Sequence, residues 1–534
     1  MQSLTFDQSI RQGVNTRNLN SFKNKTIFVK KIGEGMQAIV EQHTLKEDSD
    51  LGNKGDLVAV KKYFTNNEGD LDPATLRELN IFQKLKNCPT INQMLDINMI
   101  IKSSIQLHIM MPFHQYNLLQ LSDNTIISFA DKIKQLPSIM EQLFNALYNL
   151  YYLGVIHTDI KPDNILVDII DNQFKLSLAD FGLAIQLPCE FAYRHIKLPI
   201  YGSPLYLAPE VLTFNYYYNE KVDIWSTGIT LLDFITGEYT TEPTREQMNL
   251  ADDDGMVAII YKLFDMIKQP LYPTYQLYEQ VKRGSLHDYI DVDLLLTITL
   301  DKDYDLIPEE TIRILQSMLQ INPTDRVHIT DLYNGNLCSV TTIIERGPLL
   351  VGNVDDYFAI VYQLISLCNR LDISPVTCYL AIDLFERYIA NYQINNLSKY
   401  AATALILSHK LYESVEKMVE YKEMMQTFNV SYNELLFTQL QMLKNFNYLL
   451  TTCETDELVH TINTETDKTL KIFNFASALR YVQLSGNQLE EFKLSTVNRK
   501  EIYPRLYNMY KQIQADGLYP GELFNFDLVD YFLK

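Results

Sequence analysis

The order of apolar and polar positions predicts strands in the first part of the chain. Residues 26–63 alternate between apolar and polar side chains, and the alternation is interrupted by Gly33, Gly35 and a polar stretch around Asp48–Gly55. Another strand is predicted near Ile105–Met111. These segments predict a small β-rich lobe.

Helical spacing dominates the rest of the chain. From Pro73 to Leu85 the apolar residues follow a helical period, and a long amphipathic helix is predicted through Ile139–Leu153. After Pro209 the pattern is mostly helical. A β-rich lobe followed by an α-rich lobe predicts a bilobal α+β domain.

A break in the helical pattern divides the chain into two parts. Residues 334–353 carry Gly335, Pro348 and Gly352 and indicate a linker, after which an all-α block begins near Asp355. We therefore expect an N-terminal extension (1–24), a bilobal domain (25–340), a linker (341–354), a helical domain (355–453) and a C-terminal helical region of unassigned role (454–534).

Composition narrows the class of protein. The 534 residues are 47% hydrophobic and 21% charged, as in ordinary globular proteins, and the net charge is −20. Such acidity argues against binding to nucleic acid or to an anionic membrane. No apolar run approaches the roughly 18 residues of a membrane span. The six cysteines are dispersed without a Cys-x-x-Cys pair, so we expect reduced thiols, no structural zinc and a soluble intracellular protein.

The strongest chemical signal is a pair of short motifs. The chain reads HTDIKPDN at 157–164 and ADFG at 179–182. Phosphoryl transfer needs a base for the acceptor hydroxyl, a cation near the transferred phosphate and oxygen ligands for magnesium. The chain offers these groups in the order Asp159 as the base, Lys161 as the cation, and Asn164 and Asp180 as the metal ligands.

An upstream lysine and carboxylate complete this chemistry. VAVK at 58–61 is a short predicted strand that ends in Lys61, and Glu78 lies on the next predicted helix, so the two side chains are candidates for an ion pair. The Gly33-x-Gly35 turn before them has Ala38 where a third glycine is usual. Taken alone, that turn also fits an ordinary β-turn.

These motifs resemble those of protein kinases over residues 26–340, and within that family the cyclin-dependent group. Residues 72–78 are similar to that group's PSTAIRE helix, sharing Thr75, Arg77 and Glu78. The resemblance implies ATP and Mg²⁺ as cofactors, protein Ser or Thr hydroxyls as acceptors, and a Lys61–Glu78 ion pair in the active state. It implies a nucleotide site formed by Ile32, Gly33, Gly35, Val40, Ala59, Lys61, Met111 at the gatekeeper position, Phe113 and His114 at the hinge, and Leu166.

Two further motifs support the resemblance. GSPLYLAPE at 202–210 resembles the substrate-docking segment, and DIWSTG at 223–228 resembles the buried helix that anchors the catalytic loop. By the same resemblance, Arg326 is the buried ion-pair partner of Glu210.

The second block resembles the five-helix cyclin box, on the segments 377–389, 401–413 and 435–448. The resemblance implies that Lys410 docks on the helix that carries Glu78, with Arg77 and Glu413 as further docking residues. Gln439 stands where cyclins have an assisting Glu, so we expect that contact to be weakened or altered. Periodicity alone also fits a generic helical bundle, in which Lys410 would be a solvated lysine.

Several departures from the family concern phosphorylation. Thr158 and Ile185 stand where cyclin-dependent kinases have arginines that bind a phosphothreonine. Between Phe181 and Gly202 the only hydroxyl side chains are Tyr193 and Tyr201. Met36 and Gln37 replace the Thr and Tyr of inhibitory phosphorylation.

The sequence thus predicts a Ser/Thr kinase that acts on protein substrates and is activated by its own cyclin-like domain, within one chain or in a dimer. Two alternatives stay open. One is a pseudokinase scaffold that binds and regulates a partner kinase, and the other is a cyclin-like half that serves a separate kinase.

Overall fold

A computed structural model describes residues 22–451, except for 36, 66–69, 102–104, 187–199, 214–217, 252–253, 267–280, 282, 284–285, 336–337, 339–353, 372, 374, 393–395, 413–420 and 448–449. Within it we distinguish an N-terminal lobe (22–112), a C-terminal lobe (116–338) and a helical block (354–451). Most of the predicted extension (up to residue 21) and of the linker (up to residue 353) lies outside the described residues, as do Met36, Tyr193, Glu413 and the region after Thr451. No helix in the described ranges is long and apolar enough to cross a membrane.

A five-stranded antiparallel sheet forms most of the N-terminal lobe. The order is β1-β2-β3-β5-β4, with β1 (Thr26–Glu34), β2 (Ala38–Leu45), β3 (Leu57–Tyr63), β4 (Asp96–Ile101) and β5 (Ile105–Pro112). The backbone N–H of Gly35 donates to Ala38 O (2.9 Å) and closes the β1–β2 turn. The strands predicted from the alternation are confirmed.

The helix α2 (Pro73–Lys84) follows this sheet, as the apolar spacing predicted. Its start is fixed locally, because Asp72 Oδ1 accepts a hydrogen bond from Ala74 N (2.8 Å) and Pro73 occupies the first turn, where its missing N–H costs nothing. Nearly all of its residues are buried, so every face of the helix is covered. A helix buried all round must be covered by two neighbouring layers.

The C-terminal lobe is mainly helical, and its helices are α3 (Leu118–Ser122), α4 (Phe129–Tyr152), α5 (Pro209–Leu212), α6 (Lys221–Thr236), α7 (Arg245–Leu250), α8 (Gly255–Met266), α10 (Val292–Leu300), α11 (Glu309–Met318) and α12 (Ile329–Leu332). The prediction for α4 was too short. The helix already begins at Phe129, because the Ser128 side chain accepts from Asp131 N and caps it, and it continues through Pro137.

Short strands position the loops of the C-terminal lobe. One sheet has the order β6-β8-β9, with β6 (Tyr116–Asn117), β8 (Ile165–Ile170) and β9 (Gln173–Leu178), and β7 (Val155–Ile156) pairs with β10 (Ile185–Gln186). Single turns of 3₁₀ helix are η2 (Phe22–Asn24), η3 (Pro162–Asn164) and η5 (Pro204–Tyr206), with a longer η6 (Asp301–Leu306). These strands were not predicted.

The described part of the helical block contains five helices, as the resemblance implied: α13 (Val354–Arg370), α14 (Pro375–Asn391), α15 (Leu397–Tyr412), α16 (Tyr421–Phe428) and α17 (Tyr432–Asn445). The helix α15 contacts the other four. Ala401, Ala402 and Ala404 on α15 are fully buried, because small side chains allow neighbouring helices to approach from several sides.

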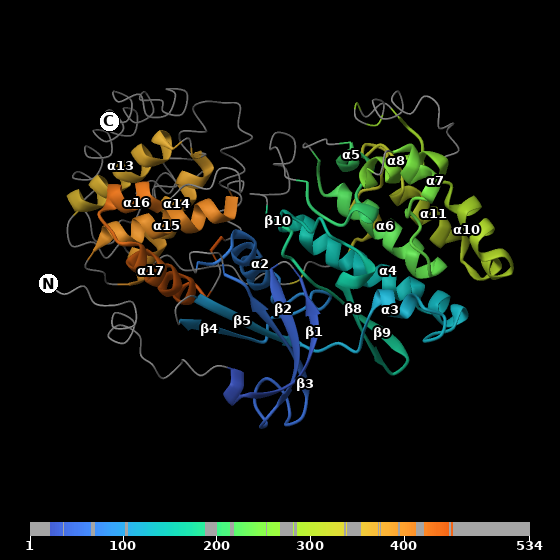
Figure 1. The fold of residues 1–534 in the computed structure, drawn as a ribbon, viewed down its shortest axis with the longest axis horizontal. Helices are drawn as coiled ribbons and strands as arrows, with labels where there is room; N and C mark the ends of the chain where they lie inside the picture. Colours follow the sequence, from blue (N-terminus) through green and yellow to red (C-terminus); the bar gives the residue numbers. More distant parts are fainter. Residues whose placement is uncertain are drawn as a thin grey trace, which may run out of the picture.

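The helical block packs against the N-terminal lobe. Figure 1 shows α2 between the sheet and the orange helices of the block, with the C-terminal lobe on the opposite side. The helix α15 contacts α2 directly. The two layers that cover α2 are therefore the sheet of its own lobe and a segment more than 300 residues away in sequence (Arg77 and Lys410 are 333 positions apart).

Candidate active site

A buried lysine and a buried carboxylate meet beside the sheet. Lys61 on β3 donates from Nζ to Glu78 Oε1 (2.7 Å) and Oε2 (3.0 Å). Tyr63, two residues further along the strand, donates from its hydroxyl to Glu78 Oε2 (2.8 Å). Glu78 is 0% exposed. The ion pair expected from the sequence is formed, and Tyr63 adds a hydrogen bond that was not predicted.

The same lysine reaches the motif at 179–182. Lys61 Nζ donates to Asp180 Oδ1 (2.9 Å), and the Asp180 side chain stays 52% exposed. Lys61 lowers the pKa of Asp180 below its ordinary value. Burial lowers the pKa of Lys61, but Glu78 and Asp180 outweigh burial and raise it. The lysine is therefore charged, and the accessible Asp180 carboxylate is ionised.

Asp159 lies at the centre of a hydrogen-bond network. Its Oδ2 accepts from Lys161 Nζ (2.8 Å) and Asn164 Nδ2 (3.0 Å). Its Oδ1 accepts from the backbone N (2.9 Å) and Oγ (2.7 Å) of Ser203. Lys161 Nζ also donates to Ser203 Oγ (2.7 Å). The network fixes the orientation of the carboxylate and brings the 202–210 segment next to it.

The loop that carries Asp159 is anchored by Asp223 on α6. Asp223 Oδ2 accepts from His157 N (2.7 Å) and Oδ1 from Thr158 N (2.9 Å). These bonds hold Thr158 at φ 65, a left-handed conformation that is costly for a β-branched residue. Thr158 Oγ1 donates to Leu183 O (2.9 Å) and links the loop to the segment after Asp180. The anchoring role expected for α6 is confirmed.

Asn164 and Asp180 are suited to Mg²⁺ by their chemistry. Asn164 uses its Nδ2 for Asp159, through O (2.8 Å) and Oδ2 (3.0 Å), which leaves its Oδ1 for a cation. Asp180 contributes an accessible carboxylate. Mg²⁺ is typically bound by one or two such oxygen side chains together with substrate phosphates. In the described ranges no cluster of three His, Cys, Asp or Glu side chains offers a metal site of another kind.

The predicted nucleotide-site residues of the N-terminal lobe lie on adjacent strands. Gly33 of β1 pairs with Val40 of β2, and Val40 pairs with Lys61 of β3. Ala59 of β3 pairs with Met111 of β5. The remaining members are Ile32 on β1, which is exposed, Gly35 in the β1–β2 turn, Phe113 after β5, and Leu166 on β8 in the other lobe. The set thus combines adjacent strands of the N-terminal lobe with one strand of the C-terminal lobe.

The hinge between the lobes is fixed by His114. Its Nδ1 hydrogen-bonds with Asp168 Oδ2 (2.9 Å) and its Nε2 with Asn92 Oδ1 (3.3 Å). Gln115 N donates to Asp168 Oδ1 (3.0 Å). The His114 side chain is engaged in this way, so only its backbone is available to a nucleotide base.

A contact that was not predicted joins the glycine turn to the 179–182 motif. Gln37 Nε2 donates to Gly182 O at 3.4 Å. A Cβ added to Gly182 would lie 2.4 Å from Gln37 Oε1, so a larger residue at position 182 would displace the end of the Gln37 side chain. The tip of the β1–β2 turn thus lies directly over the segment that carries Asp180.

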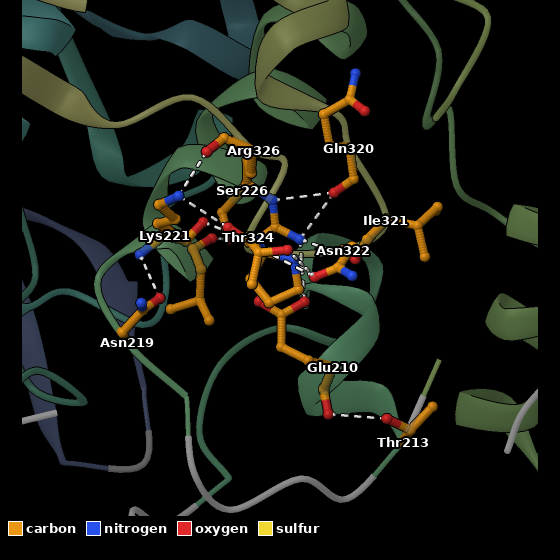
Figure 2. Close-up of polar contacts among 12 residues, drawn as sticks. Glu210, Thr213, Asn219, Lys221, Ser226, Gln320, Ile321, Asn322, Thr324 and Arg326 are labelled. Carbon is orange, nitrogen blue, oxygen red and sulfur yellow. Dashed lines mark hydrogen bonds and ion pairs between the residues drawn. The ribbon is translucent and has the colours of Figure 1, made fainter. Parts of the chain in front are cut away.

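The predicted ion pair between Glu210 and Arg326 is confirmed. Arg326 donates from Nη1 to Glu210 Oε1 (2.8 Å) and from Nη2 to Oε2 (3.0 Å), and both side chains are buried. Figure 2 shows the guanidinium between this carboxylate and the backbone carbonyl of Gln320, to which it also donates. The pair fastens the end of the 202–210 segment to the body of the lobe.

Lys410 contacts the N-terminal lobe, but its acidic partner comes from a position not considered from the sequence. Lys410 Nζ donates to Asp70 Oδ2 (2.6 Å), Leu71 O (3.0 Å) and Gln439 Oε1 (3.1 Å). Lys410 is buried, so the solvated-lysine alternative is wrong. The contact is altered rather than lost. The carboxylate that pairs with Lys410 is that of Asp70, just before α2, and Gln439 contributes a neutral acceptor, its Oε1.

Two residues of α2 also contact the helical block. Arg77 Nη1 donates to Lys410 O (3.4 Å). Asn80 Oδ1 accepts from Leu450 N (2.9 Å) and Thr451 N (3.3 Å), and its Nδ2 donates to Thr451 Oγ1 (3.0 Å). Asn80 was not predicted, because an asparagine on a helix has no sequence signal that distinguishes a docking contact from solvent exposure.

Comparisons with known proteins agree with this geometry. The family model for the protein kinase domain matches residues 27–337, and the one for the N-terminal domain of cyclins matches residues 358–451. The chain is similar to serine/threonine-protein kinase ste20 of Aspergillus oryzae (33% identical over 165 residues, 29% of this chain and 18% of that protein). It is also similar to the protein of that name in Emericella nidulans (34% over 160 residues, with the same coverage).

The chain spans less than a fifth of the length of these relatives, at 18% of each. Among solved structures, it is similar to a chain of the CAK complex of Chaetomium thermophilum bound to ATP-gamma-S. That match has a TM-score of 0.45 and 21% identity, and it covers 58% of this chain and 90% of the other.

Proposed function

Because this chain belongs to the protein kinase family and carries a cyclin N-terminal domain behind its kinase domain, we propose that the cyclin domain switches on the Ser/Thr kinase activity of the same protein. In this proposal, docking of the cyclin domain replaces phosphorylation of the activation segment. The observation that carries the proposal is that α2 contacts the cyclin domain through Arg77 and Asn80 while Glu78 on the same helix is paired with Lys61.

In the proposed reaction, Asp159 accepts the proton of a protein Ser or Thr hydroxyl. That hydroxyl then attacks the γ-phosphorus of ATP, and ADP leaves. Lys161 and Ser203 support this role, because their bonds to Asp159 orient the carboxylate. Lys161 also places a positive charge near the transferred phosphate.

Lys61 would hold the α- and β-phosphates in the orientation set by Glu78. The nucleotide would lie between the lobes, against Val40, Ala59 and Met111, with its base at the backbone of Phe113 and His114. Asn164 and Asp180 would hold Mg²⁺, which neutralises phosphate charge when bound.

The position of α2 supports activation by docking. An active kinase requires the Lys–Glu ion pair, and a helix that carries the Glu can break the pair by moving away from the sheet. Here α2 is covered on its other side by α15, and Arg77 and Asn80 tie it there. The cyclin domain thus opposes the movement that would separate Glu78 from Lys61.

Independence from phosphorylation is supported by the groups around Thr158 and Arg77. The Thr158 hydroxyl is bonded to Leu183 O and cannot act as a cationic phosphate receptor. Burial lowers the pKa of Arg77, while a hydrogen bond with Tyr201 acts in the opposite direction. The activation segment thus already supplies one interaction partner of Arg77, the Tyr201 side chain.

The two domains can dock within one chain or between two copies. A covalent linker raises the effective concentration of the second domain to roughly the millimolar range, which favours docking within the chain. Light scattering on the active protein separates the two arrangements, since only exchange between copies requires a dimer.

The activity is tested by comparing the full chain with its Asp159→Asn variant and with a form that ends at residue 345. We expect phosphorylation of a general protein substrate by the full chain only. A cooperative thermal transition must show that the short form is folded. Full activity of that folded short form would refute internal activation, whereas equal activity of the Asp159→Asn variant would refute the catalytic role.

Phosphorylation independence has its own test. The active protein is treated with a protein phosphatase, its dephosphorylation is verified by mass spectrometry, and its activity is measured again. We expect no change, because the described part of the active site contains no arginine cluster that a phosphate would complete. Loss of activity would show that a phosphorylated residue is required.

A further inference from the structure

Two cysteines that are far apart in the kinase domain sequence lie against the same helix. Cys88, in the loop after α2, donates from its Sγ to Asn145 Oδ1 on α4 (3.9 Å). Cys338, near the end of the kinase domain, donates from its backbone N to Asn149 Oδ1 on the same helix (2.9 Å). Asn149 is one helical turn beyond Asn145, and its Nδ2 donates to Asn145 O (2.8 Å). The helix therefore brings the two cysteines close together.

The two side chains contact each other, and both are thiols in this structure. Cys338 packs against the apolar core that contains Cys88. Burial raises the pKa of the Cys88 thiol to about 12, and a hydrogen bond with the Cys338 thiol acts in the same direction. A hydrogen bond with Thr90, whose Oγ1 is 3.3 Å from Cys88 Sγ, acts in the opposite direction. Cys88 therefore keeps its proton beside Cys338.

The loop that carries Cys88 is held by both lobes of the kinase domain. Cys88 N donates to Leu85 O (2.9 Å) at the end of α2. On the other side, Leu178 of β9 donates from N to Thr90 O (2.9 Å) and accepts from Asn92 N at its O (2.9 Å). A disulfide requires a specific placement of the two sulfur atoms and their Cβ atoms. Two thiols that already touch on a fixed loop and a helix need little movement to reach it.

The exposure of the two cysteines determines the order in which they can react. Cys88 is 1% exposed and protonated, and buried thiols of this kind are inert toward reagents in solvent. Cys338 is partly exposed, so a small oxidant can reach it. Redox-sensitive sites often combine an accessible thiol with a second thiol that reacts with the first oxidation product. Cys338 matches the first role and Cys88 the second.

We infer that Cys338 and Cys88 form a disulfide when the protein meets a peroxide, and that this bond fastens the end of the kinase domain to the loop after α2. The Cys338 thiolate attacks one oxygen of hydrogen peroxide, becomes a sulfenic acid and releases hydroxide, which takes up a proton to give water. The Cys88 sulfur then displaces the hydroxyl group from Cys338, and the Cys88 proton leaves with it as a second water. Two electrons pass from the thiols to the peroxide. Two molecules of a thiol reductant reverse the bond by exchange and are themselves joined as a disulfide.

The position of the bond determines its effect on the protein. The predicted linker to the cyclin domain begins just after Cys338, so the bond would fix the point from which the linker leaves the kinase domain. It would also close a long loop between the two cysteines. Such a loop restricts the unfolded chain, so the oxidised kinase domain should be more stable than the reduced one.

The first experiment exposes the full-length protein to hydrogen peroxide without denaturant, alkylates it and digests it without reductant. We expect mass spectrometry to find a peptide pair joined through Cys88 and Cys338, and a non-reducing gel to show a monomer. The thermal midpoint, followed by Trp225 fluorescence, should rise by roughly 3–8 °C and return to the reduced value after dithiothreitol. Cys338 found as a thiol, as a sulfinic acid, or joined to another cysteine or to a second copy would overturn the inference.

The two single variants should respond differently to peroxide. In Cys88→Ser, Cys338 lacks its second thiol, so it should accumulate as a sulfenic acid that dimedone labels, and excess peroxide should convert it to a sulfinic acid. In Cys338→Ser, the buried Cys88 should stay almost unlabelled. Both variants should lose the oxidative rise in thermal midpoint. Equal labelling of Cys338 and Cys88 in their respective variants would contradict the assigned order of reaction.

A control variant separates this pair from the loss of a buried cysteine in general. Cys378→Ser changes a buried cysteine of the cyclin domain, and the Cys88–Cys338 crosslink should form as in the parent. The thermal midpoint in dithiothreitol shows whether each variant is folded before oxidation. If Cys88→Ser lowers that midpoint, Cys88→Ala replaces it with the same labelling of Cys338 expected, and the peptide map of the parent decides the inference in either case. None of these measurements depends on kinase activity, so their outcome is independent of the proposed function.

Discussion

Two buried lysines act on the helix α2, and they differ in what else they contact. Lys61 from the sheet pairs with Glu78 and also with Asp180, whose side chain is half-exposed. Lys410 from the cyclin domain pairs with Asp70, and both side chains are buried. The first pair is open to solvent at Asp180, and the second is closed to solvent.

Because of this difference, we expect the two ion pairs to have separate roles. The accessible Asp180 lets the charges of the first pair act on a ligand, so a loss there should affect chemistry. The second pair contacts only protein groups, so its loss should affect the position of α2. The helix α2 couples its own position to the Lys61–Glu78 pair, because Glu78 and the docking residues Arg77 and Asn80 lie within one turn of each other.

The largest expected effect is on catalysis. Lys61→Met removes the cation that Glu78 and Asp180 share, and we expect the rate of phosphate transfer to fall by roughly 10²–10³-fold. Docking of α2 should persist, since its contacts with the cyclin domain do not involve Lys61. Steady-state kinetics and hydrogen exchange of α2 measure the two properties separately.

Lys62→Met is the matched control for this variant. Lys62 is the next residue on β3 and pairs with Glu41 (2.5 Å), away from Glu78. Its replacement should leave the rate nearly unchanged. An equal loss of activity in both variants would mean that the strand, and not the Lys61 charge, had been damaged.

A buried pair within one lobe tests whether burial alone makes such pairs costly to break. Arg326→Met leaves the Glu210 carboxylate buried without its partner, and we expect a loss of about 3–5 kcal/mol in the free energy of unfolding. Urea unfolding can be followed through Trp225, the only tryptophan, which lies 5.2 Å from the Arg326 guanidinium.

Arg313→Met provides the exposed counterpart. Arg313 forms its ion pair with Glu309 on the surface of α11, and removal should cost less than about 1 kcal/mol. Equal losses from the two arginine variants would contradict the view that desolvation determines the cost.

The local chemistry of the site was predictable from the sequence. Lys61, Asp159, Asn164 and Asp180 lie in short motifs whose chemical requirements restrict the residue types, and the structure brings these side chains to adjoining positions. Helix α2 was also predicted, because its cap and its apolar spacing are local. Periodicity predicted that the second block is helical, and its resemblance to the cyclin box implied five helices.

The docking network was only partly predictable. Asp70 and Lys410 are 340 positions apart, and nothing in the sequence around Asp70 indicates burial. Asn80 and Tyr421 likewise acquire their roles from tertiary contacts. The strands β8 and β9 were missed because short strands beside a long helix give weak periodicity. Local patterns thus indicated the candidate catalytic groups, while the partners across the interface could be identified only from the fold.

A third buried lysine shows what happens without an adjacent carboxylate. Lys132 donates to the backbone carbonyls of Ser122 and Phe234. Burial lowers its pKa from 10.5 to about 8, opposed by Asp123. At a pH between these two pKa values, Lys132 binds fewer protons in the folded state than in the unfolded state. The free energy of unfolding should therefore rise with pH across this range, by at most about 3 kcal/mol.

Lys132→Met should remove this contribution. The measurement is the difference in unfolding free energy between parent and variant from pH 7.5 to 10.5, which cancels the titration of other groups. Lys134→Met, at an exposed position of α4, should retain the dependence of the parent. A variant at position 132 with the same pH dependence as the parent would show that Lys132 stays charged despite burial.

The smallest expected effect concerns the neutral contacts of α2. Asn80→Ala leaves the N–H groups of Leu450 and Thr451 without their acceptor, and we expect docking to weaken by about 1–3 kcal/mol, less than after loss of a buried charge. Thr451→Val removes only the side-chain contact and should have a smaller effect. Exchange of the α2 amides in the full chain measures both. If Asn80→Ala weakened docking as much as Lys410→Met, the interface would depend on backbone recognition rather than on charge, and the contrast between the two buried lysines would lose its regulatory meaning.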